Sequence, residues 1–222
     1  MPEPALLLAA ALLGGITALD ATSLGQFMLS RPLVAATLGG LVAGSPEDGI
    51  RVGVVLEALH LAVLPVGAAR YPEPGPPAVA AGLAFAASGA EPPALLVAVL
   101  FALAWEYACG ATVERMRHFN ARFAGVPAEG ADPALVDRRQ WTAIAVDFAR
   151  GALLTVLGTA LLAWLLGTVD GNGFPTEWAR AVLGLVVVAG AASALRLFGR
   201  GRYPFFVGGA LAGVAVVFLL LW

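Results

Sequence analysis

Apolar residues occur in seven stretches of different length along this chain, and short segments rich in polar residues, glycine or proline separate them. The stretches are residues 5–19, 33–44, 50–67, 76–88, 92–113, 141–167 and 178–195, with 204–222 as an eighth if 76–88 is a half-span. A helix needs roughly 20 apolar residues to cross the hydrocarbon core of a bilayer. The pattern therefore predicts an all-α polytopic membrane protein with about seven to eight apolar segments, the shortest of which are re-entrant or broken helices.

Composition agrees with the hydropathy pattern. Hydrophobic residues make up 59% of the 222 residues, only 13% are charged, and the mean hydropathy is +0.85. These values lie outside the range of ordinary soluble domains. No change of composition marks off a soluble part, so residues 1–222 are expected to form a single domain within the lipid bilayer. The 27 glycines favour close packing of helices, because lipid supplies no hydrophobic force between them.

Several classes of function find no support in the sequence. Cys109 is the only cysteine, which excludes an intrachain disulfide and the usual cysteine metal sites. A net charge of −2 without a basic, aromatic stripe argues against nucleic-acid binding. Neither a nucleophile elbow nor a zinc-protease helix nor a phosphate-binding loop occurs. The chain is therefore not expected to be an enzyme or to hold a metal or a cofactor.

The positions of the arginines predict an orientation in the membrane. All thirteen basic residues are arginines, and five of them lie in or beside the longest polar stretch: Arg115, Arg117, Arg122, Arg138 and Arg139. Cytoplasmic loops carry an excess of positive charge. The loop at about 114–140 is therefore predicted to be cytoplasmic, whereas the loops at 45–49 and 170–177 and both termini are predicted to lie outside.

Two polar side chains, Glu57 and His60, interrupt the apolar stretch 50–67. An ionised carboxylate in the middle of a membrane costs roughly 2.5 to 3.5 kcal/mol, so Glu57 is expected to face protein or a water-filled cavity. His60 shares its helical face and is expected to hydrogen-bond Glu57 or a hydroxyl of a ligand. The alternatives are that Glu57 lies at the outer interface near Arg51 and that His60 is a satisfied core residue.

A second polar group follows the first apolar stretch, at Asp20 and Gln26. Two interpretations remain open. Asp20 caps a helix at a break in the membrane, with Thr22 and Ser23 satisfying freed backbone groups. Alternatively, Asp20 and Gln26 present acceptors and an amide to a polyhydroxylated ligand.

Two other charged positions have a simple structural explanation. Arg31-Pro32 is expected to begin a helix, with the proline in its first turn and the arginine at the cytoplasmic interface. The alternative is a direct contact of Arg31 with a ligand. Asp147 and Arg150 are three residues apart at the start of an apolar stretch and are expected to form an ion pair within one helix.

A series of motifs between residues 19 and 73 is difficult to obtain by hydropathy alone. They are Leu19-Asp20, Gln26-Phe-Met-Leu-Ser-Arg31-Pro32-Leu33, Leu56-Glu57, Pro65-Val-Gly67-Ala68-Ala69 and Pro72-Glu73, and weaker motifs follow at His118-Phe-Asn120 and Gly201-Arg-Tyr-Pro-Phe-Phe-Val-Gly-Gly209. In these motifs, which extend over nearly the whole chain, the protein resembles the sugar-specific enzyme II C component of the mannose/fructose/sorbose family of bacterial phosphotransferase systems.

This resemblance implies a permease subunit that moves a sugar inward across the bacterial cytoplasmic membrane. It also implies a D-type membrane partner, cytoplasmic A and B components, and a homo- or hetero-oligomeric assembly in which the B component phosphorylates the arriving sugar. By position, the candidates for binding the sugar are Asp20, Gln26 and Glu57. His60, three residues after Glu57, is a fourth candidate. The candidates for structural or gating roles are Arg31, Pro32, Pro65 and Gly67.

The chain departs from better-known mannose members at two of these positions. Those members have asparagine in place of Pro65 and an apolar residue in place of His60. Two other functions therefore stay open beside the permease. One is a non-transporting membrane subunit that recruits phosphotransferase proteins for regulation, and the other is a secondary transporter that acts alone.

Overall fold

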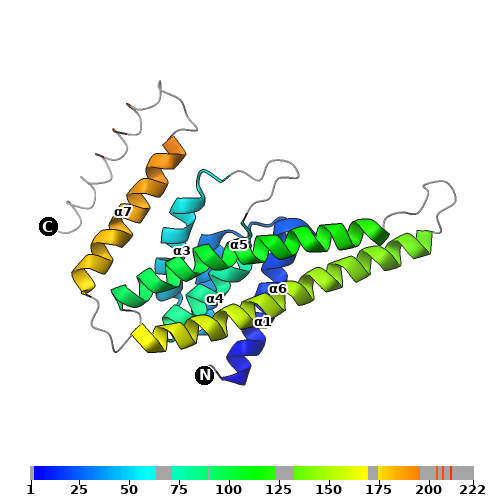
Figure 1. The fold of residues 1–222 in the computed structure, drawn as a ribbon, viewed down its shortest axis with the longest axis horizontal. Helices are drawn as coiled ribbons and strands as arrows, with labels where there is room; N and C mark the ends of the chain where they lie inside the picture. The colour runs from blue at the N-terminus through cyan, green and yellow to red at the C-terminus, as the bar shows by residue number, and fades with distance from the viewer. Residues whose placement is uncertain are drawn as a thin grey trace.

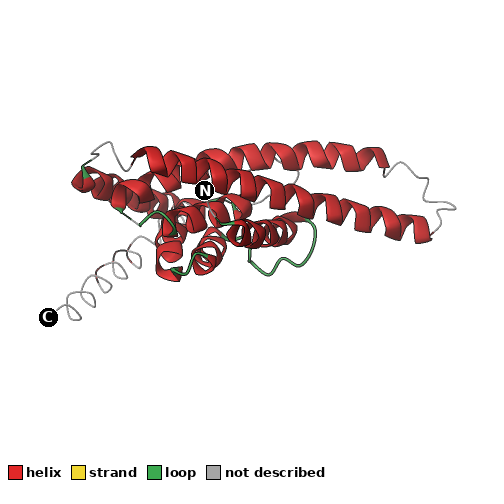
Figure 2. Cartoon of the chain, turned by 90° about the horizontal axis from the view of Figure 1, so that it is seen from below, coloured by secondary structure: helices red, strands yellow, loops and turns green. Residues whose placement is uncertain are grey.

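The computed structural model describes residues 3–63, 72–89, 91–123, 133–169 and 175–195, with the single positions 204, 207 and 211. Within these ranges the regular structure is entirely helical (Figures 1 and 2). The helices are α1 (Pro4–Thr22), α2 (Pro32–Val42), α3 (Pro46–His60), α4 (Gly75–Ala86), α5 (Pro92–Phe123), α6 (Pro133–Val169) and α7 (Thr176–Leu195). The all-α prediction is confirmed. The apolar stretch 204–222 and the candidates Pro65 and Gly67 lie outside the described residues.

Three of the helices are too short to cross a bilayer. α2, α3 and α4 have 11, 15 and 12 residues, or about 16, 22 and 18 Å at a rise of 1.5 Å per residue. The prediction of short, broken helices is therefore confirmed. The segment 45–49, predicted as a loop, is instead largely the first turn of α3. Its sequence explains this difference, because Pro46 and the acidic pair Glu47 and Asp48 favour a helix N-terminus.

Helix α4 lies at the centre of the molecule and contacts α1, α2, α3, α5 and α6. Its residues from Gly75 to Phe85 are all buried. A helix that is apolar on every side is typical of a position inside a bundle. The core around α4 includes Val52 and Leu56 from α3 and Leu162 from α6.

Helices α1 and α6 cross at a contact made by glycines. A Cβ added to Gly151 would lie 2.3 Å from the Cβ of Ala18 and 2.6 Å from the carbonyl oxygen of Gly14. Only glycine permits the two backbones to approach this closely. The high glycine content therefore serves helix packing here, as predicted.

Helices α5 and α6 are the longest and extend as a pair beyond the rest of the bundle (Figure 1). Their 32 and 37 residues correspond to about 48 and 55 Å, well over the roughly 30 Å of a bilayer core. The polar stretch at about 114–140, predicted as a loop, is therefore largely helical. α5 continues to Phe123 and α6 begins at Pro133.

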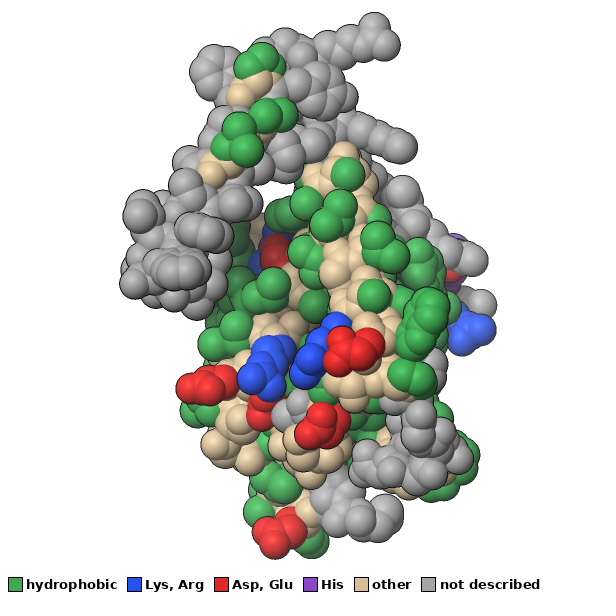
Figure 3. Space-filling model, turned by 90° about the vertical axis from the view of Figure 1, so that its left-hand side faces the viewer, with side chains coloured by type: hydrophobic (Ala, Val, Ile, Leu, Met, Phe, Trp, Pro, Cys, Tyr) green, Lys and Arg blue, Asp and Glu red, His purple; other side chains and the backbone are tan. Residues whose placement is uncertain are grey.

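Four helices, α1, α5, α6 and α7, are long and apolar enough to cross a membrane. Figure 3 shows hydrophobic side chains spread over one face, with basic and acidic side chains beside one another near its middle and further charged side chains apart from them. Trp164, Leu185 and Val188 are between 66% and 70% exposed. Such an apolar surface is suited to contact with lipid, as expected of a multi-pass membrane protein.

Candidate functional site

Asp20 organises the segment that joins α1 to α2. It lies in the last turn of α1, is 4% exposed, and accepts hydrogen bonds from the backbone N–H of Phe27 at 2.5 Å and of Ser30 at 2.8 Å. The Ser30 hydroxyl donates a third bond to the same carboxylate at 2.9 Å. Asp20 therefore holds a loop rather than capping its own helix, because its oxygens satisfy backbone groups of residues that follow the helix.

This loop presents Gln26 at the surface. Gln26 has φ 58° and Met28 has φ 66°, both in the left-handed region that non-glycine residues rarely adopt. Gln26 is exposed, and next to it Phe27 and Met28 are 77% and 69% exposed. Strained backbone held by a buried carboxylate is a feature found at binding sites.

Glu57 forms an ion pair with Arg31, not with Arg51 or His60. The Arg31 guanidinium donates to Glu57 Oε1, and the backbone N–H of Leu33 lies 3.3 Å from Oε2. Leu33 is in the first turn of α2, where backbone N–H groups have no partner within the helix. Glu57 therefore caps α2 from α3, and Pro32 is the first residue of α2 as predicted. Arg51 pairs instead with Asp48 at 3.0 Å.

His60 points away from this group. Its Nδ1 lies 2.8 Å from the carbonyl oxygen of Leu56, and its Nε2 lies 3.0 Å from Oε2 of Glu106 on α5. Both side chains are almost fully buried, with 6% and 5% exposed. The interpretation that His60 bonds Glu57 is therefore wrong, because the ring faces a carboxylate on another helix.

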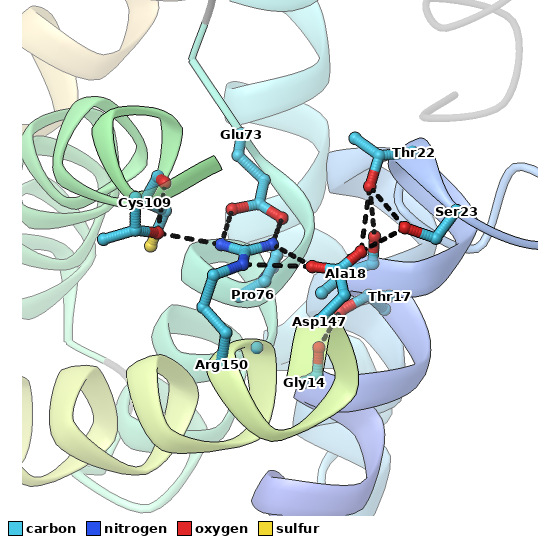
Figure 4. Close-up of polar contacts among 12 residues, drawn as sticks. Gly14, Thr17, Ala18, Thr22, Ser23, Glu73, Pro76, Cys109, Asp147 and Arg150 are labelled. Atoms are coloured by element: carbon cyan, nitrogen blue, oxygen red, sulfur yellow. Dashed lines mark hydrogen bonds and ion pairs between the residues drawn. The ribbon is translucent and has the colours of Figure 1, made fainter. Parts of the chain in front are cut away.

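A second polar cluster lies where α1, α5 and α6 meet the residues before α4 (Figure 4). Arg150 binds Glu73 through two parallel contacts of 2.6 and 2.7 Å, and it binds Asp147 at 2.8 and 3.0 Å. Thr112 of α5 accepts a further hydrogen bond from Arg150 at 2.9 Å. The ion pair between Asp147 and Arg150 is confirmed, but its extension to Glu73 was not predicted.

Asp147 connects this cluster to the loop held by Asp20. Its second carboxylate oxygen accepts hydrogen bonds from the hydroxyls of Thr22, at 3.0 Å, and of Ser23. Asp147 is fully buried, and a buried charge is tolerated only when it is paired and hydrogen-bonded. The end of α1 is thereby fixed to α6, directly before the loop that carries Gln26.

Of the predicted residues, the structure brings Asp20, Gln26, Arg31 and Glu57 around one loop and sets His60 apart from them. The acids that sequence analysis missed are Glu73 and Glu106. Pro72-Glu73 belongs to the motifs of the resemblance, which was the available signal for Glu73. Glu106 had no such signal. In the described residues, no group of acidic, histidine or cysteine side chains has the geometry of a metal site.

Comparison with known proteins identifies the family. A family model described as the sorbose-specific IIC component of the phosphotransferase system matches residues 5–219. The chain belongs to this family. Its members are permease components of a sugar phosphotransferase system, and this IIC chain is accordingly a multi-pass membrane protein of that type.

Individual relatives agree with the assignment. The chain is 28% identical over 212 residues to the sorbose-specific EIIC component of Klebsiella pneumoniae, which covers 89% of this chain and 76% of the relative. It is 40% identical over 50 residues to the corresponding protein of Lacticaseibacillus casei, which covers 22% of this chain and 18% of the relative. A solved structure titled "Structure of membrane protein" matches all of this chain and 96% of its own length, with a TM-score of 0.72 at 20% identity, and so shares the fold.

Proposed function

We propose that this IIC component moves a hexose inward and that a partner B component phosphorylates the sugar on arrival. Sorbose is the first sugar to test, because the relatives from Klebsiella pneumoniae and Lacticaseibacillus casei are named for it. The helical scaffold supports a transport role, since it combines four helices of spanning length with short apolar helices, and broken helices form the substrate sites of many transporters.

The observation that carries the proposal is that Gln26 and Arg31 lie on the same loop and that Arg31 pairs with Glu57 of α3. The amide of Gln26 is exposed, the Arg31 side chain is 42% exposed and the Glu57 side chain is 17% exposed. Together they offer donors and acceptors for several hydroxyl groups of one sugar. Asp20 has a supporting role in this proposal, because its carboxylate already accepts three hydrogen bonds within the loop.

A D-type membrane subunit is part of the proposal. Leu24, Phe27 and Met28 are 54%, 77% and 69% exposed on the same loop as Gln26. Exposed apolar side chains beside a polar site are typical of a surface that a partner covers. We expect this subunit to complete the sugar site. Uptake by liposomes that contain this chain alone would instead support a secondary transporter.

Substitution of Glu57 by glutamine tests the site. Glu57→Gln keeps the shape and one acceptor but loses a charge-assisted hydrogen bond, which is worth about 1.5–3 kcal/mol, or roughly 10- to 150-fold in sugar affinity. Sorbose binding is measured by calorimetry on the complex purified from membranes, with melting temperature measured in parallel. We expect weaker binding and only a small fall in melting temperature, because the Arg31 side chain of the weakened ion pair is 42% exposed and the glutamine keeps an acceptor for the N–H of Leu33.

The matched control is Asp48→Asn. It breaks an ion pair on the same helix, between Asp48 and Arg51, at the end of α3 remote from the loop. Sugar affinity should stay at the wild-type value in this variant. If Glu57→Gln lowers melting and leaves affinity unchanged, Glu57 is structural and the proposed site is wrong. Sugar binding without uptake by the complete system would favour the regulatory role.

A further inference from the structure

The contact between His60 and Glu106 requires a proton that neither residue ordinarily holds at neutral pH. The ring nitrogen Nδ1 lies 2.8 Å from the carbonyl oxygen of Leu56. A carbonyl oxygen only accepts, so Nδ1 must carry the hydrogen and donate it. In a neutral imidazole the other nitrogen, Nε2, then presents a lone pair.

This lone pair would face another acceptor. Nε2 lies 3.0 Å from the Oε2 atom of Glu106, and no described residue makes a well-directed hydrogen bond with it. A neutral ring beside an ionised carboxylate would place two acceptors in contact within a buried site, where an unpaired polar group is costly. One added proton removes the conflict, either on Nε2, as imidazolium with carboxylate, or on Glu106, as carboxylic acid with neutral imidazole.

We propose that His60 and Glu106 form a proton-binding site inside the helix bundle, which keeps one proton at neutral pH and joins α3 to α5 while that proton is bound. The ligand is the proton itself, and on release it passes to water. The pair is neutral with the proton and carries one negative charge without it.

The surroundings of the pair favour retention of the proton. α3 and α5 pack against each other and against α4 and α7. In addition, α3 contacts α2, and α5 contacts α6. α2 and α4 contain no titratable residue, and the titratable residues described on α7, Glu177 and Arg180, lie in its first turn. The charged or titratable residues near the pair are Glu57 on α3, Cys109 on α5 and Glu73 just before α4. Arg150 on α6 pairs with Glu73 and with Asp147.

These neighbours leave an excess of negative charge. Glu57 is offset by Arg31, and Arg150 faces the two acids Glu73 and Asp147. Cys109 is a fully buried thiol and is neutral in that setting. A further negative charge on the pair would be opposed by this field, which favours the form of the pair that carries the proton.

Glu106 also contacts the chain at a second point. Its carbonyl oxygen accepts a hydrogen bond from the backbone N–H of Glu73 at 3.1 Å. Glu106 is therefore in contact with His60 at the end of α3 and with Glu73 just before α4. Loss of the proton would weaken one of the two contacts and would leave a net negative charge on the pair, whose His60 lies one helical turn from Glu57. We therefore expect loss of the proton to affect sugar binding. This expectation rests on the proposed function.

The protonation state is measured directly by nitrogen NMR. The chain has only two histidines, so His118→Gln, at an exposed position on α5, leaves His60 as the single imidazole signal of ¹⁵N-histidine-labelled protein in nanodiscs. At pH 7.5 we expect either both ring nitrogens protonated or, by infrared spectroscopy, a carboxylic-acid band that Glu106→Gln removes. A neutral ring together with an ionised Glu106 at this pH would overturn the proposal.

Glu106→Gln is also the functional comparison. Its amide N–H₂ donates to Nε2 without any bound proton, so the contact no longer depends on pH. In the wild type the contact between the two side chains needs the bound proton, so the stabilisation that it gives is lost when rising pH removes that proton. We expect the melting temperature to fall between pH 6.5 and 9 more steeply in the wild type than in Glu106→Gln. Identical slopes would contradict the proposal.

Sugar affinity gives a separate result. We expect it to fall at least threefold over the same pH range in the wild type and to change less than twofold in Glu106→Gln. If the complex binds no sugar at any pH, the proposed function fails, but the NMR result still decides whether the proton site exists. If sugar binds with the same pH dependence in both proteins, the proton on this pair does not affect sugar binding, and that part of the proposal is wrong.

Discussion

The backbone of Gln26 shows how one residue combines strain with exposure. Its left-handed conformation, φ 58°, is unfavourable for a residue with a Cβ, by roughly 1–2 kcal/mol. Asp20 offsets this cost by accepting hydrogen bonds from Phe27 and Ser30, which hold the loop in place. The side-chain amide of Gln26 is thereby kept at the surface instead of folding into the bundle.

Gln26→Gly should separate binding from folding. Glycine adopts the left-handed conformation without strain, so stability should be unchanged or slightly higher. The lost amide would remove a neutral hydrogen bond worth about 0.5–1.5 kcal/mol, which lowers sugar affinity roughly 2- to 12-fold. Met28→Gly is the control, since Met28 has φ 66° but an apolar side chain. Equal loss of affinity in both variants would mean that the loop backbone, not the amide, determines binding.

Arg150 is the residue on which the second cluster depends. It joins two buried carboxylates, and its own side chain is 11% exposed. Removal of one partner from a buried ion pair leaves an uncompensated charge and costs about 3–5 kcal/mol. Arg150→Met should therefore lower the melting temperature strongly, and Arg150→Lys should lie between it and the wild type, because an ammonium cannot form the two parallel contacts.

The same substitution at Arg51 provides the comparison. Arg51 is 59% exposed in its pair with Asp48, and exposed ion pairs contribute only about 0–1 kcal/mol. Arg51→Met should melt within a few degrees of the wild type, as measured by thermal unfolding in detergent. If the two methionine variants melt alike, the cluster around Arg150 does not stabilise the fold as argued.

At the scale of the helices, hydropathy predicted the existence of the elements better than their ends. The apolar stretches 92–113 and 141–167 identify α5 and α6, but both helices continue into polar sequence, to Phe123 and from Pro133. A polar helix that leaves the membrane has no hydropathy signal, so its continuation could not be predicted in this way. α3 shows the converse, because its start at Pro46 has a local signal in the proline and the acidic residues after it.

The candidate site, like the helices, was predictable only in part from the sequence. Glu57 and the pair of Asp147 with Arg150 follow from local sequence, because a charge in an apolar stretch or at helical spacing is visible there. Glu106 is not, since its partner His60 is 46 positions away in the chain. The contact exists only because α3 and α5 pack together, and a single sequence does not show which helices are neighbours.

Helix packing depends on glycines where backbones touch. A Cβ added to Gly82 in α4 would lie 2.1 Å from the carbonyl oxygen of Ala36 in α2, whereas one added to Gly184 in α7 meets nothing within 4 Å. Gly82→Ala should therefore force the helices apart and lower the melting temperature, despite the better helix propensity of alanine. Gly184→Ala should be neutral or slightly stabilising. Similar melting of both variants would show that α2 and α4 shift without cost.

At the scale of the whole molecule, the pair formed by α5 and α6 gives the chain a polar end. The two helices extend beyond the rest of the bundle (Figure 1). Arg115 and Arg117 lie toward the end of α5, and Arg138 and Arg139 lie near the start of α6. In an antiparallel pair these arginines lie at the same end. The clustering strengthens the reason to place this end in the cytoplasm, because positive charge is retained on that side of the membrane.

Labelling of single cysteines tests this orientation. Cys109 is fully buried, and Cys109→Ala removes any background. In that variant, Asp137→Cys, at an exposed position of α6, should resist an impermeant thiol reagent added to intact cells and should react after the cells are opened. Glu91→Cys, exposed directly before α5, should react from outside, because α5 crosses the membrane between the two positions. Reaction of Asp137→Cys from outside, with protection of Glu91→Cys, would invert the orientation and place the group around Gln26 and Glu57 on the opposite side of the bilayer.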